Sequence, residues 1–221
     1  DHKDYQAPED LIPAGSPCKH CGTVALLGRP NVGKSTLLNY ITGMKIAIVS
    51  HKPQTTRTNI KTIYNTEDTQ IIFTDTPGIH KPTSRMGEYM VDRSYKAALG
   101  ADCVVLIADG RFPEPGSVER RLMELLKEGD KKVILAINKY DEAGQEKLLP
   151  LTQKYSELYS FEDIIPISAK TGRNVDLLMS VITDMLPEGP RLYDSEYMTD
   201  QTERVIAAEL IREQVLHYTD Q

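Results

Sequence analysis

The sequence contains few cysteines, no long apolar run and no excess of positive charge. Its three cysteines are too few for a framework of several disulfides, and no apolar run approaches the roughly 18 residues of a membrane-spanning helix. A charged and apolar secretory leader is also missing. From these absences we expect a protein of the reducing cytoplasm, without a disulfide scaffold or a membrane span.

The balance of charge is acidic. Lysine and arginine number 26 against 32 aspartate and glutamate residues, which gives a formal net charge of −6. Nucleic acid and anionic membranes repel such a surface, so binding either would need a local basic patch or a further segment. At 221 residues we expect one main domain with at most a small appendage.

The first 22 residues combine charges, three prolines and two glycines without apolar periodicity. We therefore predict a flexible extension over residues 1–22. Cys18 and Cys21 form a lone CxxC there, with His20 between them. A metal or redox role would need a second ligand pair or a thioredoxin-like context, and neither follows, so we expect free thiols.

From Thr23 onward, short apolar runs alternate with helical stretches. Their nearly continuous, β-branched character is typical of strands covered on both faces. We predict an α/β fold with a mostly parallel sheet and helices on both faces. The predicted strands lie in TVALLG, IKTIYN, QIIFTDTPG, DCVVLIADG, KKVILAINKYD and DIIPISA.

The connections between these runs indicate the topology. Too few residues separate the two runs between Ile60 and Thr74 for a crossover helix, so we predict one antiparallel hairpin. KSTLLNYITG ends at Gly43, a glycine suited to a helix C-cap. Further apolar residues recur at helical spacing over Met86–Leu99, Val118–Lys127, Glu146–Tyr159 and Val175–Leu186.

The sequence changes character after LPEGP. Thr202 precedes ERVIAAELIREQVL, which is typical of a capped amphipathic helix. One side of that helix is apolar: Val205, Ala208, Ile211 and Val215. We predict a main domain over 23–187, and a linker and first helix of a further domain over 188–221.

The stretch GRPNVGKST, Gly28–Thr36, follows a predicted strand and opens a predicted helix. Glycines at 28 and 33 let successive N–H groups point at a phosphate chain, while Lys34 adds a cation and Ser35 a hydroxyl for Mg²⁺. We predict a nucleotide-binding loop with Lys34 also acting in catalysis. Its residues are Gly28, Arg29, Pro30, Asn31, Val32, Gly33, Lys34, Ser35 and Thr36.

The base is indicated by NKYD, Asn138–Asp141, which follows VILAI. An aspartate can accept hydrogen bonds from the guanine N1–H and exocyclic amine, whereas adenine presents an acceptor at N1. We predict guanine binding by Asn138, Lys139 and Asp141, with Asp141 setting specificity. SAK, Ser168–Lys170, offers the Ala169 amide to the guanine carbonyl, and we place Ser168 and Lys170 in the same site.

DTPG, Asp75–Gly78, ends another predicted strand. Asp75 can reach Mg²⁺ through water, and the Gly78 amide can meet the γ-phosphate. We predict nucleotide contacts from the whole motif, including Thr76 and Pro77, and a catalytic role for Gly78. Four such loops at strand C-termini, each facing the phosphates or the base and in this order, are strong evidence for a guanine-nucleotide site.

These motifs resemble those of the translational P-loop GTPases and, within them, the Era family. The matching stretches are GRPNVGKSTLLN, PQTTRTNI, DTPGIHKP, NKYD and PISAKTGRNVD, and YMTDQTERVIAAELIREQVL extends the resemblance to Gln221. The resemblance implies a Ras-like G domain that binds GTP and GDP with Mg²⁺. A KH domain that binds the 3′ end of 16S rRNA during 30S subunit assembly would follow.

No GxxG loop of a KH fold occurs before Gln221. We therefore expect most of that domain to be missing, and we do not expect this chain alone to bind the rRNA. The family resemblance also implies a monomer that associates peripherally with the inner face of the cell membrane.

The same resemblance assigns switch regions. Ile46–Thr58 would be switch I, with Thr56 as a catalytic residue and Mg²⁺ ligand and Thr55 as the alternative, and the segment from Gly78 to about Met90 would be switch II. Arg57 and Arg85 are candidate arginine fingers, with solvated surface arginines as the alternative.

Ile79 stands where many GTPases have a glutamine that orients water, so we expect slow intrinsic hydrolysis. Relatives with the same substitution use K⁺, with Asn31 as the matching ligand; the alternative is that Asn31 only shapes the loop. Two other functions stay open. A pseudo-GTPase would hold GTP without turnover, and a small-molecule kinase would also use a phosphate loop, although NKYD and SAK argue against it.

Overall fold

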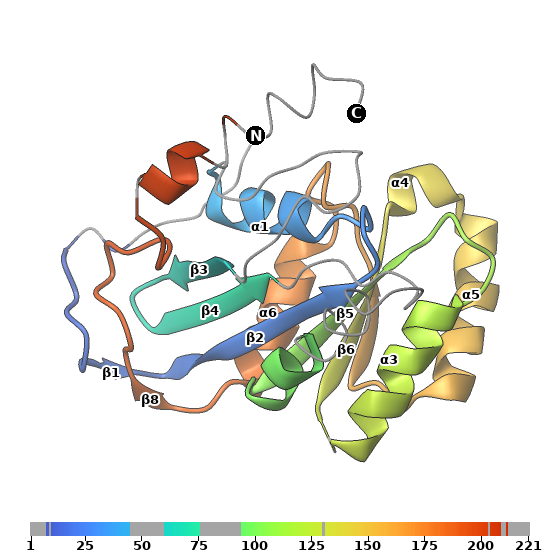
Figure 1. The fold of residues 1–221 in the computed structure, drawn as a ribbon, viewed down its shortest axis with the longest axis horizontal. Coiled ribbons are helices and arrows are strands. Elements are labelled where there is room, and N and C mark those ends of the chain that lie inside the picture. The colour runs from blue at the N-terminus through green and yellow to red at the C-terminus, as the bar shows by residue number, and fades with distance from the viewer. Residues whose placement is uncertain are drawn as a thin grey trace.

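The computed structural model describes residues 8, 10–44, 60–75, 94–129, 131–202, 204–208 and 211. Its centre is a six-stranded sheet in the order β3-β4-β2-β5-β6-β7 (Figure 1). The strands are β2 (His20–Gly28), β3 (Ile60–Asn65), β4 (Thr69–Asp75), β5 (Cys103–Asp109), β6 (Val133–Asn138) and β7 (Asp163–Pro166). This is the predicted Ras-like α/β architecture.

The predicted hairpin is confirmed. β3 pairs antiparallel with β4, and Thr66–Asp68 form the turn between them. All other neighbours in this sheet are parallel. Their register places Leu26 opposite Asp75 and Asp109 opposite Asn138, so the polar residues that end the strands lie along one edge of the sheet.

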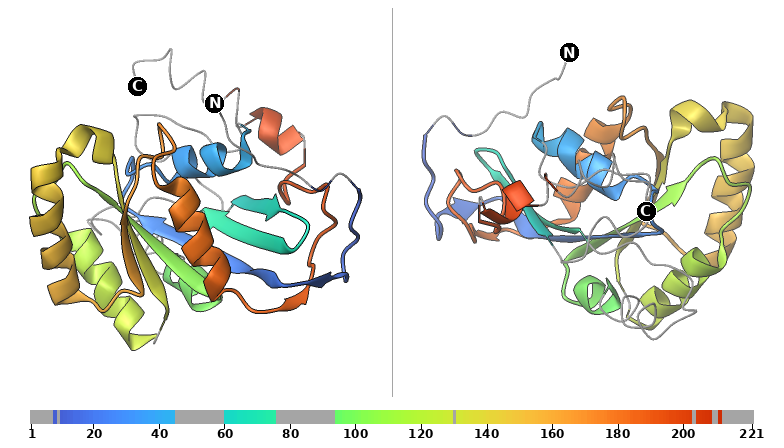
Figure 2. Two further views of the ribbon diagram at one scale, coloured as in Figure 1. Left: turned by 180° about the vertical axis from the view of Figure 1, so that it is seen from behind. Right: turned by 45° about the horizontal axis from the view of Figure 1, so that its top comes forward.

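Helices cover both faces (Figures 1 and 2). The helices α1 (Lys34–Thr42) and α6 (Val175–Met185) pack on one face together with Val24 and Leu26 of β2. The helices α3 (Ser117–Glu128) and α5 (Gln145–Leu158) pack on the other face with Ala25 and Leu27. Successive β2 residues thus point to opposite cores, as the pleat of a strand requires, which explains the continuous apolar run.

The predicted helices are confirmed within one or two residues wherever the structure describes them. α1 ends at Thr42 and is followed by the C-cap Gly43, whose left-handed φ of 64° suits glycine. Residues 94–99 are helical, and the earlier part of the predicted Met86–Leu99 helix lies outside the described residues. The short helix α4 (Tyr140–Ala143) was not predicted, because four residues carry no helical period. Among the described residues, no helix is long and apolar enough to cross a membrane.

The prediction of a flexible tail is wrong for residues 17–22. β2 starts at His20, and β1 (Pro17–Cys18) pairs antiparallel with β8 (Gly189–Pro190). Cys18 and Cys21 are buried free thiols whose Sγ atoms donate to the carbonyls of Asp68 and Pro190. The order of this segment comes from partners that lie far away in the sequence, which a local pattern cannot reveal.

Residues after 188 also pack on the main domain instead of leaving it directly. Thr199 forms a bridge with Thr62, and the Ile63 N–H donates to the Met198 carbonyl at 2.8 Å. This segment therefore covers the outer edge of β3, which would otherwise expose unpaired backbone groups. Residues 204–208 and 211 are helical after Thr202, as predicted, and Val205 and Ile211 are exposed; Val215 lies outside the described residues.

Candidate nucleotide site

The loop between β2 and α1 adopts the conformation that its glycines allow. Gly28 has a φ of 153° and Gly33 a φ of 106°, and Asn31 is also left-handed at 61°. A Cβ on Gly28 would lie 2.5 Å from the Ile107 carbonyl oxygen, and a Cβ on Gly33 would collide with the Asn138 side-chain amide. Only glycine fits these two positions, because both the conformation and the close neighbours exclude a side chain.

Lys34 is the most deeply buried charge of this loop, with 6% of the residue exposed. Its Nζ donates to the carbonyls of Gly28 at 3.1 Å and Arg29 at 3.0 Å. Burial lowers the pKa of the ammonium, while the charge of Asp75 opposes that change. The loop therefore holds a cation inside the protein where an anionic ligand would be attracted.

Ser35 and Asp75 meet at the start of α1. The Ser35 Oγ donates to Asp75 Oδ2 at 3.2 Å, and Asp75 is fully buried at the end of β4. A hydroxyl and a carboxylate together form an oxygen donor set of the kind that Mg²⁺ prefers. These two residues fit the predicted metal site. The third predicted ligand, Thr56, lies outside the described residues.

Asn138 joins three of the predicted loops at one point. Its side-chain amide donates to the Val32 carbonyl at 2.7 Å, and its Oδ1 accepts from the Ala169 N–H at 2.9 Å. Asn138 is buried, so these partners replace water. Because the Ala169 N–H already donates to Asn138, a base carbonyl would have to share that hydrogen.

Lys139 extends from the same loop towards the phosphate loop. Its backbone is left-handed, with a φ of 63°, and its Nζ donates to the Asn31 carbonyl at 2.6 Å and to Asp109 Oδ2 at 2.8 Å. Sequence reasoning missed Asp109. The available signal was its position after the apolar run CVVLIA, where it ends a strand as Asp75 and Asn138 do.

Asp109 is held as a carboxylate. Burial acts to raise the pKa of this group, but hydrogen bonds from Arg111 and then Lys139 outweigh burial and lower the pKa. Arg111 also forms an ion pair with Glu142 of α4 at 3.0 Å. These contacts link the end of β5 to both predicted nucleotide loops.

The predicted specificity residue Asp141 lies on α4 and is exposed. Within the described part of the chain, its carboxylate makes no hydrogen bond or ion pair. Ser168 is buried, and its Oγ accepts from the Thr171 N–H at 3.2 Å, so this side chain shapes the SAK turn. Lys170 is exposed beside that turn.

The Arg29 side chain points away from the phosphate loop. Its Nε lies 3.8 Å from Glu119 Oε1, and its Cζ lies 5.0 Å from the centre of the Phe112 ring. Burial raises the pKa of Glu119, and Arg29 opposes that change. Arg29 thus contributes its carbonyl to the loop and its side chain to packing against α3. The sequence pattern did not indicate that Glu119 pairs with Arg29, because Glu119 is simply one polar residue of an amphipathic helix.

Several predicted residues lie outside the described part of the chain, so the structure places none of them. They are Thr55, Thr56, Arg57, Thr76, Pro77, Gly78, Ile79 and Arg85. The remaining predicted residues lie together at the carboxyl edge of the sheet. Parallel α/β sheets bind ligands at this edge.

A family model described as 50S ribosome-binding GTPase matches residues 23–139. GTPase Era of Alkaliphilus metalliredigens is 49% identical over 201 residues, which cover 90% of this chain and 68% of that protein. GTPase Era of Clostridioides difficile is 46% identical over 198 residues, which cover 89% of this chain and 66% of that protein.

Two solved structures have the same fold. Era in complex with MgGDPNP and nucleotides 1506–1542 of 16S ribosomal RNA superimposes with a TM-score of 0.85 at 36% identity, over 92% of this chain and 69% of that one. A variant of Aquifex aeolicus Era bound to GDP·AlF4⁻ gives a TM-score of 0.85 at 36% identity, over 91% of this chain and 69% of that one.

Proposed function

Because the chain belongs to the Era family of GTPases, we propose that it binds GTP and GDP on the loops that follow β2, β4, β6 and β7. It hydrolyses GTP to GDP and phosphate at the loop containing Lys34. The observation that carries this proposal is the Asn138 amide, which bonds to Val32 of the phosphate loop and to Ala169 of the SAK turn. One buried side chain thereby fixes the spacing between a phosphate subsite and a base subsite.

The residues present divide the work of phosphoryl transfer. The backbone N–H groups of Asn31–Ser35 and the Lys34 ammonium bind the phosphate chain, because they concentrate positive charge in a buried loop. Ser35 and Asp75, with Thr56 as a further ligand, would hold Mg²⁺, which supplies charge neutralisation on the phosphates when bound. The Gly78 amide would contact the γ-phosphate.

Base recognition falls to Asp141. The exposed carboxylate on α4 can accept from both guanine donors, and the ion pair between Arg111 and Glu142 of the same helix holds α4 next to the end of β5. Replacing Asp141 with Asn turns one of its two acceptor oxygens into an amide donor that would face the guanine amine, so we expect GTP affinity to fall at least about a hundredfold and xanthosine nucleotides to be preferred. Competition against a fluorescent GDP analogue measures both quantities.

Asp163→Asn is the matched control, because Asp163 begins β7 at the opposite edge of the sheet. It should leave GTP and xanthosine affinities at the parent values. If Asp141→Asn keeps the parent's GTP affinity, guanine specificity does not come from this residue.

We also propose that hydrolysis depends on K⁺, with Asn31 as a ligand. The support is chemical, because Ile79 lacks the side-chain amide with which a glutamine would orient water. A cation at the phosphates would compensate by neutralising charge in the transition state. Phosphate release should be faster in KCl than in NaCl at matched ionic strength, and Asn31→Ala should reduce that difference. Equal rates of the parent in the two salts would rule the proposal out.

The RNA-binding activity of the longer relatives is proposed for the longer protein and not for this chain. This chain spans 68% of the Alkaliphilus relative, and we propose that residues 188–221 lead into a KH-type domain that contacts 16S rRNA. The net charge of −6 supports the expectation that this chain alone binds RNA weakly. In a gel-shift titration, the rRNA 3′ sequence should bind no better than an unrelated strand.

From the family alone, we also propose a monomer with peripheral membrane association.

A further inference from the structure

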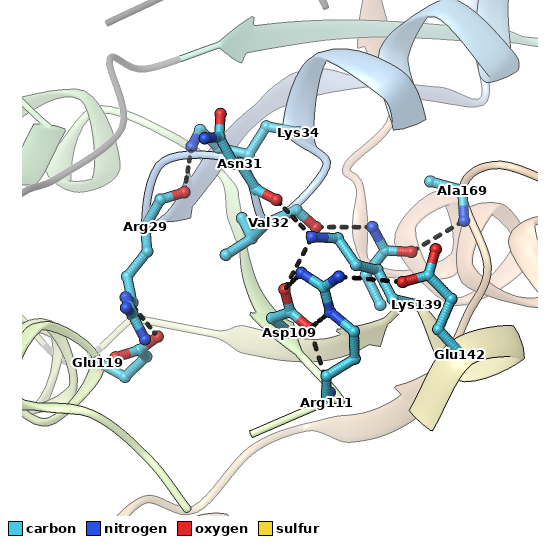
Figure 3. Close-up of polar contacts among 11 residues, drawn as sticks. Arg29, Asn31, Val32, Lys34, Asp109, Arg111, Glu119, Lys139, Glu142 and Ala169 are labelled. Atoms are coloured by element: carbon cyan, nitrogen blue, oxygen red, sulfur yellow. Dashed lines mark hydrogen bonds and ion pairs between the residues drawn. The ribbon is translucent and has the colours of Figure 1, made fainter. Parts of the chain in front are cut away.

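Asp109 lies between the phosphate loop and the base-recognition loop and accepts four hydrogen bonds (Figure 3). Oδ1 accepts from the Arg111 backbone N–H at 3.1 Å and from its Nε at 2.9 Å. Oδ2 accepts from Arg111 Nη2 and from Lys139 Nζ, both at 2.8 Å. Only 5% of the Asp109 side chain is exposed, so little water competes for these oxygens.

The first connection from Asp109 runs to the phosphate loop. The Lys139 ammonium is fixed at two points, by Asp109 on one side and by the Asn31 carbonyl on the other. Asn31 has a left-handed φ of 61°, an uncommon conformation for a residue other than glycine. Lys139 therefore connects Asp109, at the end of β5, to Asn31 in the phosphate loop.

The second connection runs to the base-recognition helix. Arg111 places its Nη2 on Asp109 and its Nη1 on Glu142 of α4, at 3.0 Å. Glu142 is adjacent in sequence to Asp141, the residue expected to read guanine. This connection is more exposed than the first, because 45% of the Arg111 side chain is accessible.

We propose that Asp109 is a positioning residue for the bound nucleotide, which holds the phosphate loop through Lys139 and the base-recognition helix through Arg111. This inference rests on the proposed function. Asp109 belongs to none of the motifs that identified the site. Its effect is on how long the nucleotide stays bound, because it fixes the distance between the two loops that grip opposite ends of the ligand.

The test is the dissociation rate of a fluorescent GDP analogue from the full chain, chased with excess unlabelled GDP. Asp109→Asn keeps the shape of the side chain but removes its charge and one acceptor oxygen. We expect release to accelerate about tenfold, as for the loss of one charge-assisted hydrogen bond. The matched control is Asp68→Asn, because Asp68 also bonds a lysine, Lys19, but lies in the β3–β4 turn at the opposite edge of the sheet.

A double variant separates positioning from general stability. If Asp109 acts through Lys139, then adding Asp109→Asn to Lys139→Met should change the release rate by less than about twofold beyond Lys139→Met alone. A purely structural role would instead lower the melting temperature of every variant and give additive effects. Thermal unfolding without nucleotide is measured alongside the rates.

Arg111→Gln tests the second connection on a side chain exposed enough to change without unfolding the protein. We expect release about twofold faster, and a smaller effect at high salt, because exposed ion pairs are screened. Arg121→Gln is its control, since it removes the exposed Arg121–Glu124 pair of α3. Parent-like release from both Asp109→Asn and Arg111→Gln overturns the inference alone. Failure of the parent to bind any guanine nucleotide overturns it together with the proposed function.

Discussion

Lys34 and Arg191 are the two almost fully buried cations among the described residues, and they lie near opposite ends of β4. Lys34 is 6% exposed at the nucleotide edge, and Arg191 is 2% exposed beside the β3–β4 turn. Both are held mainly by backbone carbonyls. Lys34 donates to Gly28 and Arg29, while Arg191 donates to Thr66 at 2.6 Å and Glu67 at 2.7 Å.

The two sites differ in what surrounds the cation. Burial lowers the pKa of Lys34, so the folded protein disfavours its charge unless a phosphate is present. Arg191 is embedded in a network of amides instead. Gln70 donates to Asn65 Oδ1 and the Tyr193 carbonyl and accepts from the Leu192 and Tyr193 N–H groups, so all its bonding capacity is used. We infer that Lys34 serves the ligand, whereas Arg191 and Gln70 fasten residues 189–193 to the sheet.

The largest expected effect comes from Lys34→Ala. Nucleotide affinity should fall about a thousandfold, because charge-assisted bonds to phosphate are lost in a buried site. The nucleotide-free protein should stay as stable as the parent, since a disfavoured buried charge is removed. Titration with fluorescent GDP and thermal unfolding measure the two quantities. Lys19→Ala, at an exposed lysine, is the control; nucleotide binding by Lys34→Ala at parent strength would break the comparison.

Arg191→Met should lower the stability of the protein and leave its nucleotide affinity nearly unchanged, the opposite of Lys34→Ala. We expect the free energy of unfolding to fall by about 3 kcal/mol, because the carbonyls of Thr66 and Glu67 lose the donor that the buried Arg191 supplies. GDP affinity should change by less than about twofold. Urea denaturation gives the first quantity and GDP titration the second, with Arg121→Met as an exposed control. A large loss of GDP affinity with unchanged stability would reverse the assigned roles.

Gln70→Met tests whether the second site is a network. The change leaves the backbone groups of Leu192 and Tyr193 without their side-chain partner, and we expect a loss of about 2 kcal/mol in unfolding free energy. Combined with Arg191→Met, the total loss should be smaller than the sum of the single losses. Additive losses would show that the two side chains act independently.

The smallest effect concerns pH. The pKa of Lys34 is lower in the folded state than its ordinary value of about 10.5. Between these two pKa values the unfolded chain binds more protons, so the contribution of Lys34 to stability rises with pH. Nucleotide-free Lys34→Met should therefore be slightly more stable than the parent at pH 7, and the difference in melting temperature should shrink towards pH 10. A difference that grows with pH would contradict the lowered pKa.

Sequence reasoning reached one of these two sites and not the other. The spacing of Gly28, Gly33, Lys34 and Ser35 identified the phosphate loop, because each residue acts through its immediate backbone neighbours. Arg191 carried no signal, since it stands in a segment without periodicity and its partner Asn65 lies 126 positions away. Asp109 was missed for a related reason. Its position at a strand end was visible, but its contact with Lys139 depends on the pairing of β5 with β6.

The sequence by itself determined the six strands of the main sheet, the antiparallel hairpin, the described helices longer than one turn and the loops that form the candidate site. These features follow from patterns within about ten residues, where apolar periodicity and glycine conformation act locally. Only the tertiary structure decided that residues 17–22 are ordered, that residues 197–200 cover the edge of β3, and that Asp109 joins two loops. Each of these depends on burial between distant segments, which removes water as a partner and makes one particular protein group necessary in its place.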